Sequence, residues 1–301
     1  MRGDILLAMR TAAKEANRAA AMQIAAGSAW WLFERASFAD CLSMVEAARA
    51  IPGDCAPEHE ATALYACVFV TRLWGDRRAA ARYLELMQEA ALRSEDPGFH
   101  ALVRMGAAYQ AAVTGDPAEA EKVLAAIDED VRAVTGWVRH DLLISRAVAL
   151  RDIGKPARAL ADLSEAHRMA DAAGDSYGVK NAVYVTGMIL LSLRRAREAV
   201  QVLRIRVVRG LETEDWVSAL SAIAVIACAC HVLDRNELGA ELFAGVDTIG
   251  KRFSYAPISE DFFPVYRDRL REALPADKWE AALRRGEQLS FRDLVRQAQS
   301  F

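Results

Sequence analysis

The sequence has few of the residues that mark a disulfide-bonded or metal-binding protein. Its five cysteines are Cys41, Cys55, Cys67, Cys228 and Cys230. An odd number of cysteines with no CxxC pair is typical of a protein in a reducing cytoplasm. Cys228 and Cys230 lie two positions apart on a predicted helix, so their side chains point to nearly opposite sides and cannot bind one metal together. We interpret them as buried structural thiols.

The sequence also lacks a strong charge of one sign. The formal net charge is −3, and no run of five like charges occurs. A nucleic-acid-binding protein usually has a basic face, and this composition does not require one. We therefore expect no direct binding of nucleic acid by this chain.

Long hydrophobic segments are scarce. Residues 1–20 contain Asp4, Lys14 and Glu15 and no apolar core of a signal peptide. Val217 to Leu233 has no formal charge over 17 residues, which is close to the length of a membrane span. It falls where the repeat described below requires a helix, so we interpret it as a helix buried between repeats. We predict a cytoplasmic protein that does not associate with membranes.

The sequence contains none of the common catalytic motifs. There is no HExxH, GxSxG or GxxxxGK[ST] element, and the five histidines have no metal-ligand spacing. His140 and Asp141 are neighbours, so on a helix they diverge by about 100° and need partners from elsewhere. We expect no enzyme activity, no cofactor and no metal site.

The most informative feature that is present is a pattern recurring every 39 or 40 residues. Its anchors are Ala36, Gly75, Gly115, Gly154, Arg194 and Asp234. Five positions later the residues are small, namely Cys41, Ala80, Ala120, Ala159, Ala199 and Gly239. Nine positions later they are bulky and apolar, namely Val45, Leu84, Leu124, Leu163, Leu203 and Phe243. Positions four apart lie on one helix face, so each repeat carries a helix with a small contact followed by a large one.

The pattern and the turn residues place six pairs of helices along the chain. The expected pairs are 16–35 with 37–50, 58–74 with 76–93, 98–114 with 116–129, 137–153 with 155–173, 177–193 with 195–210, and 215–233 with 235–251. Val202 to Val208 alternates like a β-strand, but the repeat puts it in a helix and a lone strand would have no partner. Three shorter helices are expected at 261–274, 276–285 and 290–299.

A period in this range with one helical hairpin per repeat predicts a stacked solenoid. We expect an all-α, tetratricopeptide-like right-handed superhelix of about six hairpins over residues 1–252. A short helical cap at 253–301 would cover the apolar face of the last repeat.

The repeats and their ending resemble the superhelical domain of ATPase-linked bacterial transcriptional regulators of the LuxR and maltose-activator type. The ending matches the closing motif of that family at Trp279, Ala282, Gly286, Leu289, Ser290 and Asp293, while Leu283 replaces the usual second aromatic residue. The resemblance implies a domain that receives signals and binds proteins. The ATPase motif of those regulators is missing from this sequence, and direct operator binding is not carried over.

In such superhelices the first helix of each pair lines the concave side, where partners bind. Our binding candidates are Arg72, Arg104, Tyr109, Arg146, Asn181 and Tyr184, and Trp30, Trp31 and Tyr65 are further aromatic candidates. Trp30 and Trp31 cannot both face one side. The alternative is that the aromatics pack between repeats and the arginines are solvated or paired with a neighbouring repeat.

Three functions remain open at this point. The first is the signal-receiving and protein-interaction domain of such a regulator. The second is a stand-alone adaptor that binds a peptide or protein. The third is a sensor with a small-molecule effector inside the superhelix near Tyr184 and Trp216.

Overall fold

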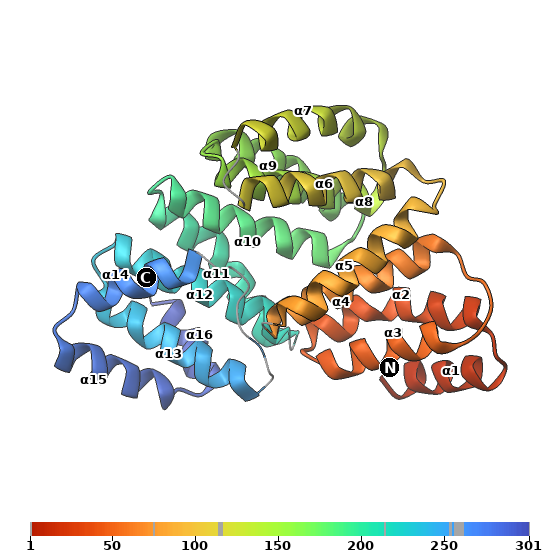
Figure 1. Ribbon diagram of the computed structural model, residues 1–301. Coiled ribbons are helices and arrows are strands. Elements are labelled where there is room, and N and C mark those ends of the chain that lie inside the picture. The colour runs from red at the N-terminus through yellow and green to blue at the C-terminus, as the bar shows by residue number, and fades with distance from the viewer. Residues whose placement is uncertain are drawn as a thin grey trace. The chain divides into compact units, whose positions relative to one another are not determined.

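The protein is built from α-helices alone within the part of the chain that the structure describes. The computed structural model describes residues 2–74, 76–113, 117–213, 215–252, 255 and 262–300. Its helices are α1 (Arg2–Lys14), α2 (Arg18–Glu34), α3 (Phe38–Ala50), α4 (Pro57–Leu73), α5 (Arg77–Leu92), α6 (Pro97–Val113), α7 (Pro117–Ala133), α8 (Gly136–Asp152), α9 (Pro156–Ala172), α10 (Ser176–Ser192), α11 (Ala196–Glu212), α12 (Trp216–Val232), α13 (Asn236–Arg252), α14 (Phe262–Glu272), α15 (Ala276–Glu287) and α16 (Phe291–Ala298) (Figure 1). The predicted all-α architecture of helical hairpins is confirmed.

The 40-residue period follows from the length of the helices. From α6 to α13 every helix has 17 residues. From α8 to α13 three residues separate each helix from the next, so a helix and its turn occupy 20 residues and a hairpin occupies 40.

The four described anchor residues of the repeat lie in left-handed backbone conformation at the turns. The φ angle is +52° at Ala36, +79° at Gly154, +60° at Arg194 and +56° at Asp234. After Arg194, the N–H of Arg195 donates to the carbonyl of Leu190 at 2.8 Å, which is the bond that closes a Schellman motif. The same bonding recurs at the other three turns. Gly75 and Gly115 lie outside the described residues.

The small and large positions of the repeat pack between paired helices. Ala120 on α7 and Ala159 on α9 are fully buried, and Leu124 and Leu163 are at most 2% exposed. A Cβ added at Gly239 would stand 3.0 Å from the carbonyl oxygen of Ala227, which explains why this position has no side chain. Leu84 is an exception because it is only half-buried, and Tyr83 and Met87 fill the core of α5 instead.

The chain divides into two compact units, residues 1–103 (unit 1) and 104–301 (unit 2), with the boundary inside α6. In unit 1, α2 packs against α3 and α4, and α4 packs against α5. The helix α1 was not expected, and it packs against α2 and α3. In unit 2 each helix from α8 to α12 packs against the next one, and α8, α10 and α12 also contact one another in succession.

The last three helices close unit 2 around α13. Helix α14 contacts α12 and α13, α15 contacts α13, and α16 contacts α11, α12 and α13. Gly286 makes this possible because a side chain there would collide with the backbone carbonyl of Glu241 and the methyl group of Ala244. Ser290 accepts from the N–H of Asp293 at 3.2 Å and caps α16. The expected helical ending at 253–301 is thus present in the described residues and belongs to unit 2.

The structure shows the conformation of two segments whose sequence was ambiguous. Val202 to Val208 lies in α11, where Leu203 and Val207 are buried while Ile205 is 63% exposed. The apolar segment at 217–233 lies mainly in α12, whose residues are nearly all buried. Among the described helices, none is long and apolar enough to cross a membrane.

Candidate functional site

Three half-buried aromatic residues meet on the first helices of unit 1. Trp30 on α2 lies between Tyr65 and Phe69 on α4, with ring centroids 5.9 Å and 5.5 Å away. Tyr65 and Phe69 are one turn apart and their centroids are 5.2 Å apart. All three pairs are edge-to-face, which is a preferred arrangement of aromatic rings. We call Trp30, Tyr65 and Phe69 the aromatic cluster.

A fourth aromatic residue, Phe33, packs against the cluster, whereas Trp31 does not. Phe33 is buried and contacts both Trp30, at 5.4 Å between centroids, and Phe69, at 6.5 Å. Trp31 lies instead beneath the guanidinium of Arg35, 4.3 Å from its ring centroid. The two neighbouring tryptophans therefore have different surroundings, as their 100° separation on a helix requires.

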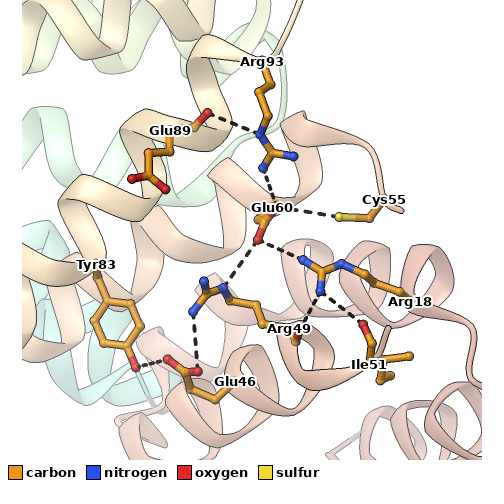
Figure 2. A network of polar contacts seen from close by, with 9 residues as sticks. All are labelled: Arg18, Glu46, Arg49, Ile51, Cys55, Glu60, Tyr83, Glu89 and Arg93. Carbon is orange, nitrogen blue, oxygen red and sulfur yellow. Dashed lines mark hydrogen bonds and ion pairs between the residues drawn. The ribbon is translucent and has the colours of Figure 1, made fainter. Parts of the chain in front are cut away.

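A buried carboxylate joins four helices of unit 1, including α2 and α4, which carry the cluster. Glu60, at the start of α4, is 5% exposed and receives three guanidinium groups (Figure 2). The Glu60 carboxylate oxygens lie 3.2 Å from Arg18 of α2, 3.4 Å from Arg49 of α3 and 2.7 Å from Arg93 at the end of α5. Arg18 also donates to the carbonyl oxygens of Arg49 and Ile51, at 2.6 Å and 3.2 Å.

The charges around Glu60 decide its protonation. Burial acts to raise the pKa of Glu60, but the hydrogen bond from Arg93 and the charges of Arg18 and Arg93 outweigh it and hold the pKa below its ordinary value. Arg49 is shared with Glu46, which accepts from the hydroxyl of Tyr83 at 2.7 Å. The network is therefore an ionised structural clamp across α2, α3, α4 and α5.

Arg146 does not lie in an open groove. It is 8% exposed, and its Nε and Nη2 each lie 2.7 Å from a carboxylate oxygen of Asp162 on α9. Its Nη1 pairs with Asp128 on α7. Because both carboxylates come from neighbouring second helices, Arg146 is paired within the fold, as the alternative interpretation of the arginines expected, and its role in binding stays a prediction.

Asn181 and Tyr184 lie half-buried on α10. Arg206 of α11 stands 5.6 Å from the ring centroid of Tyr184, and its Nη2 donates to Ser218 Oγ at 3.1 Å. Burial raises the pKa of Tyr184 and lowers that of Arg206. Tyr184 thus packs against the second helix of its own hairpin.

The structure gives less information on the remaining three candidates. Arg104 is exposed on α6. Arg72 lies on α4 and Tyr109 on α6, and both side chains are outside the described residues. Among the candidates of unit 2 whose side chains are described, Arg146 is directed toward α7 and α9, while Tyr184 packs against α11. Phe69 was missed, although its position four residues after Tyr65 was a usable signal.

One histidine and two cysteines of unit 2 have buried, structural surroundings. His140 is buried and its Nε2 lies 2.8 Å from Asp175, the residue that caps α10. Burial acts to raise the pKa of Asp175, but the hydrogen bonds from His140 and the Gly178 N–H outweigh it and lower the pKa. Burial raises the pKa of Cys228 and brings that of Cys230 to about 12. Within the described residues no group of three histidine, cysteine or acidic side chains could hold a metal.

Comparison with known proteins adds nothing to this description. No protein-family model matches the chain, and no curated protein matches it either. The resemblance to ATPase-linked regulators therefore stays a prediction.

Proposed function

We propose that the protein is a non-catalytic helical-repeat scaffold that binds a partner protein or peptide along the first helices of unit 1. The observation that carries this proposal is the aromatic cluster. Trp30, Tyr65 and Phe69 come from two adjacent first helices and remain partly exposed. Aromatic residues of this kind provide much of the energy at protein interfaces.

The cluster is prepared for binding before a partner arrives. Each ring is held edge-to-face by another, and the helices beneath are joined through Glu60. A partner would therefore lose little side-chain entropy in the scaffold when it binds, which favours affinity.

The cellular role that fits this surface best is signal reception in a bacterial transcriptional regulator of the ATPase-linked type. This part of the proposal rests on the closing motif at Trp279 to Asp293, which resembles that family. A cytoplasmic location fits the five cysteines, all of which are unpaired thiols. An ATPase module and a helix-turn-helix encoded in the same reading frame would support this role, and their absence there would leave a stand-alone adaptor.

Site-specific photocrosslinking tests the binding surface. We would place p-benzoyl-L-phenylalanine at Tyr65 on α4 and, as a matched control, at Leu92 on the second helix α5, which is 61% exposed. The expected result is a partner crosslinked at position 65 and not at position 92. Equal crosslinking at the two positions would contradict the proposal.

Affinity for the partner found in this way gives the second test. Trp30→Ala or Phe69→Ala should weaken binding by roughly 30-fold, the size of a strong hot spot. Tyr177→Ala is the control because Tyr177 is a half-buried tyrosine on the first helix α10 of unit 2. A loss of affinity of the same size in all three variants would argue against a site at the cluster.

A further inference from the structure

A cavity of about 600 Å³ lies in unit 2 beside the turns that follow α10 and α12. Its walls include Arg194 and Asp234 from these turns, His231 from α12, and Tyr266 and Arg269 from α14. The volume is within the range of small-molecule sites, roughly 300–1,000 Å³. The cavity is distinct from the aromatic cluster, which belongs to unit 1.

Two of the lining residues have an unfavourable backbone conformation. Arg194 and Asp234 have φ angles of +60° and +56°, whereas Gly154 and Gly174 occupy the corresponding position in two other turns. A side chain in left-handed conformation costs energy that glycine avoids. Ala16 and Ala36 share this conformation but are uncharged and do not line the cavity, so among the described residues the charged side chains at such turns are the two that border it. Backbone strain of this kind is common at functional sites.

The cavity wall holds two arginines and one carboxylate, so positive charge is in excess there. Within the described residues neither Arg194 nor Arg269 forms an ion pair, although both are exposed. Their neighbours behave differently, since Arg195 pairs with Glu198 at 2.7 Å and Arg267 pairs with Asp247. Arg269 is instead 5.4 Å from the ring centroid of Tyr266.

The other walls supply an apolar surface, polar side chains and the carboxylate. Leu191 and Val232 line the cavity, and Tyr266 is 8% exposed. The imidazole of His231 lies 6.4 Å from the Tyr266 ring between centroids, and its Nδ1 is 3.2 Å from Asn236 Oδ1. Asp234 forms no ion pair in the described part of the chain, so its carboxylate can accept a hydrogen bond from a ligand.

We propose that this cavity binds a small organic anion that carries a carboxylate or phosphate group together with a hydroxyl or amino group. Arg194 and Arg269 bind the anionic group, because guanidinium ions match the geometry of both oxyanions. Asp234 accepts from the hydroxyl or amino group, and the carbon skeleton lies against Leu191 and Val232. The inference does not depend on the partner-binding surface proposed for unit 1.

Isothermal titration calorimetry on the full chain tests the proposal. The probes are malate, glutamate, glycerol 3-phosphate and inorganic phosphate at constant ionic strength, with glycerol as the neutral control. We expect at least one anion to bind saturably and glycerol not to bind. Binding by malate or glutamate alone would assign a carboxylate ligand, and binding by the phosphates alone would assign a phosphorylated one. If none of the four anions binds saturably, the proposal is wrong.

Three variants separate a ligand site from a structural role. Arg269→Ala and Arg194→Gly should each weaken binding by at least about tenfold, which corresponds to the loss of a charged hydrogen bond. Arg194→Gly should also raise the melting temperature of the ligand-free protein because it relieves the backbone strain. Arg271→Ala, which removes an exposed arginine on α14 that does not line the cavity, should leave affinity unchanged. Unchanged affinity in both Arg269→Ala and Arg194→Gly would overturn the proposal.

Discussion

Single residues at the turns set where each helix ends. Ala36 and Gly154 occupy corresponding turns with φ angles of +52° and +79°. The left-handed conformation costs energy for alanine but not for glycine. Neither residue lines the cavity of unit 2. Substitutions at Ala36 and Gly154 should therefore report only the conformational energy of the turn.

Exchanging these two residue types should change stability in opposite directions. A non-glycine residue in left-handed conformation costs about 1–2 kcal/mol, and a glycine loses about 0.4–1 kcal/mol through the entropy of the unfolded chain. Ala36→Gly should therefore stabilise the protein by about 0.5–1 kcal/mol, and Gly154→Ala should destabilise it by about the same amount. Urea unfolding monitored by circular dichroism measures both changes. If both substitutions changed the free energy of unfolding in the same direction, the left-handed conformation would not be what determines their effect.

Arg146 joins three helices of unit 2 through its ion pairs with Asp128 and Asp162. Its loss would leave Asp162, which is 8% exposed, without its cation, whereas Asp128 would keep Arg158 at 3.1 Å. Arg146→Met should destabilise the protein by about 3–5 kcal/mol, since an uncompensated buried charge remains. Arg146→Met combined with Asp162→Leu should recover most of that loss because both charges are removed. A double-mutant cycle in urea gives the coupling, and additive effects would contradict the pairing.

Residue types alone could not show that Arg146 is paired. The sequence places Arg146 on a first helix, as it does Arg104, which is exposed, and nothing local distinguishes the two. Asp128 lies on the preceding helix α7 and Asp162 on the following helix α9. The ion-pair partners of Arg146 depend on how three helices pack together. The spacing of residues along one helix gives no information on that packing.

At the scale of helices, the sequence predicted the elements well and their ends approximately. The expected helix 177–193 corresponds to α10 at Ser176–Ser192, because the anchors of the repeat lie at the left-handed turn residues. Helix α7 was expected to end at 129 but continues to Ala133. Helix α1 was missed because Ala16, its left-handed turn residue, is not a residue type that signals a turn.

The clamp at Glu60 joins four helices and should make unit 1 sensitive to acid. The pKa of Glu60 is lower in the folded protein than in the unfolded chain, so its contribution is present above the unfolded value of about 4.3. That contribution is lost as the pH falls through the folded pKa. The free energy of unfolding of the natural protein should therefore decline below about pH 4.3.

Glu60→Gln provides the control for this dependence. Glutamine has nearly the same shape but no charge, so the variant should be less stable at pH 7 and lose less on acidification. The difference between the two proteins should shrink as pH falls. Urea unfolding at a series of pH values measures this difference. If the free energies of unfolding of the two proteins changed in parallel with pH, Glu60 would not be the origin of the acid sensitivity.

At the scale of the whole molecule, a repeat array differs from a globule in how far a perturbation travels. Each hairpin contacts mainly its neighbours in the chain, so stability is close to a sum of local terms. The division into unit 1 and unit 2 has the same origin, since the compact units are groups of neighbouring helices. A defect in the closing helices should accordingly remain within unit 2.

Gly286→Ala tests this locality. A methyl group there would collide with the carbonyl of Glu241 and with Ala244 on α13, so α15 should separate from α13 at a cost of about 1–3 kcal/mol. Hydrogen exchange should accelerate in α15 and α16 and in the facing residues of α13, while α2 to α5 of unit 1 keep their protection. Exposed Arg284→Ala on the same helix is the control and should change exchange little. Faster exchange throughout unit 1 in Gly286→Ala would mean that the molecule unfolds as one cooperative body, because local stacking alone cannot transmit the defect that far.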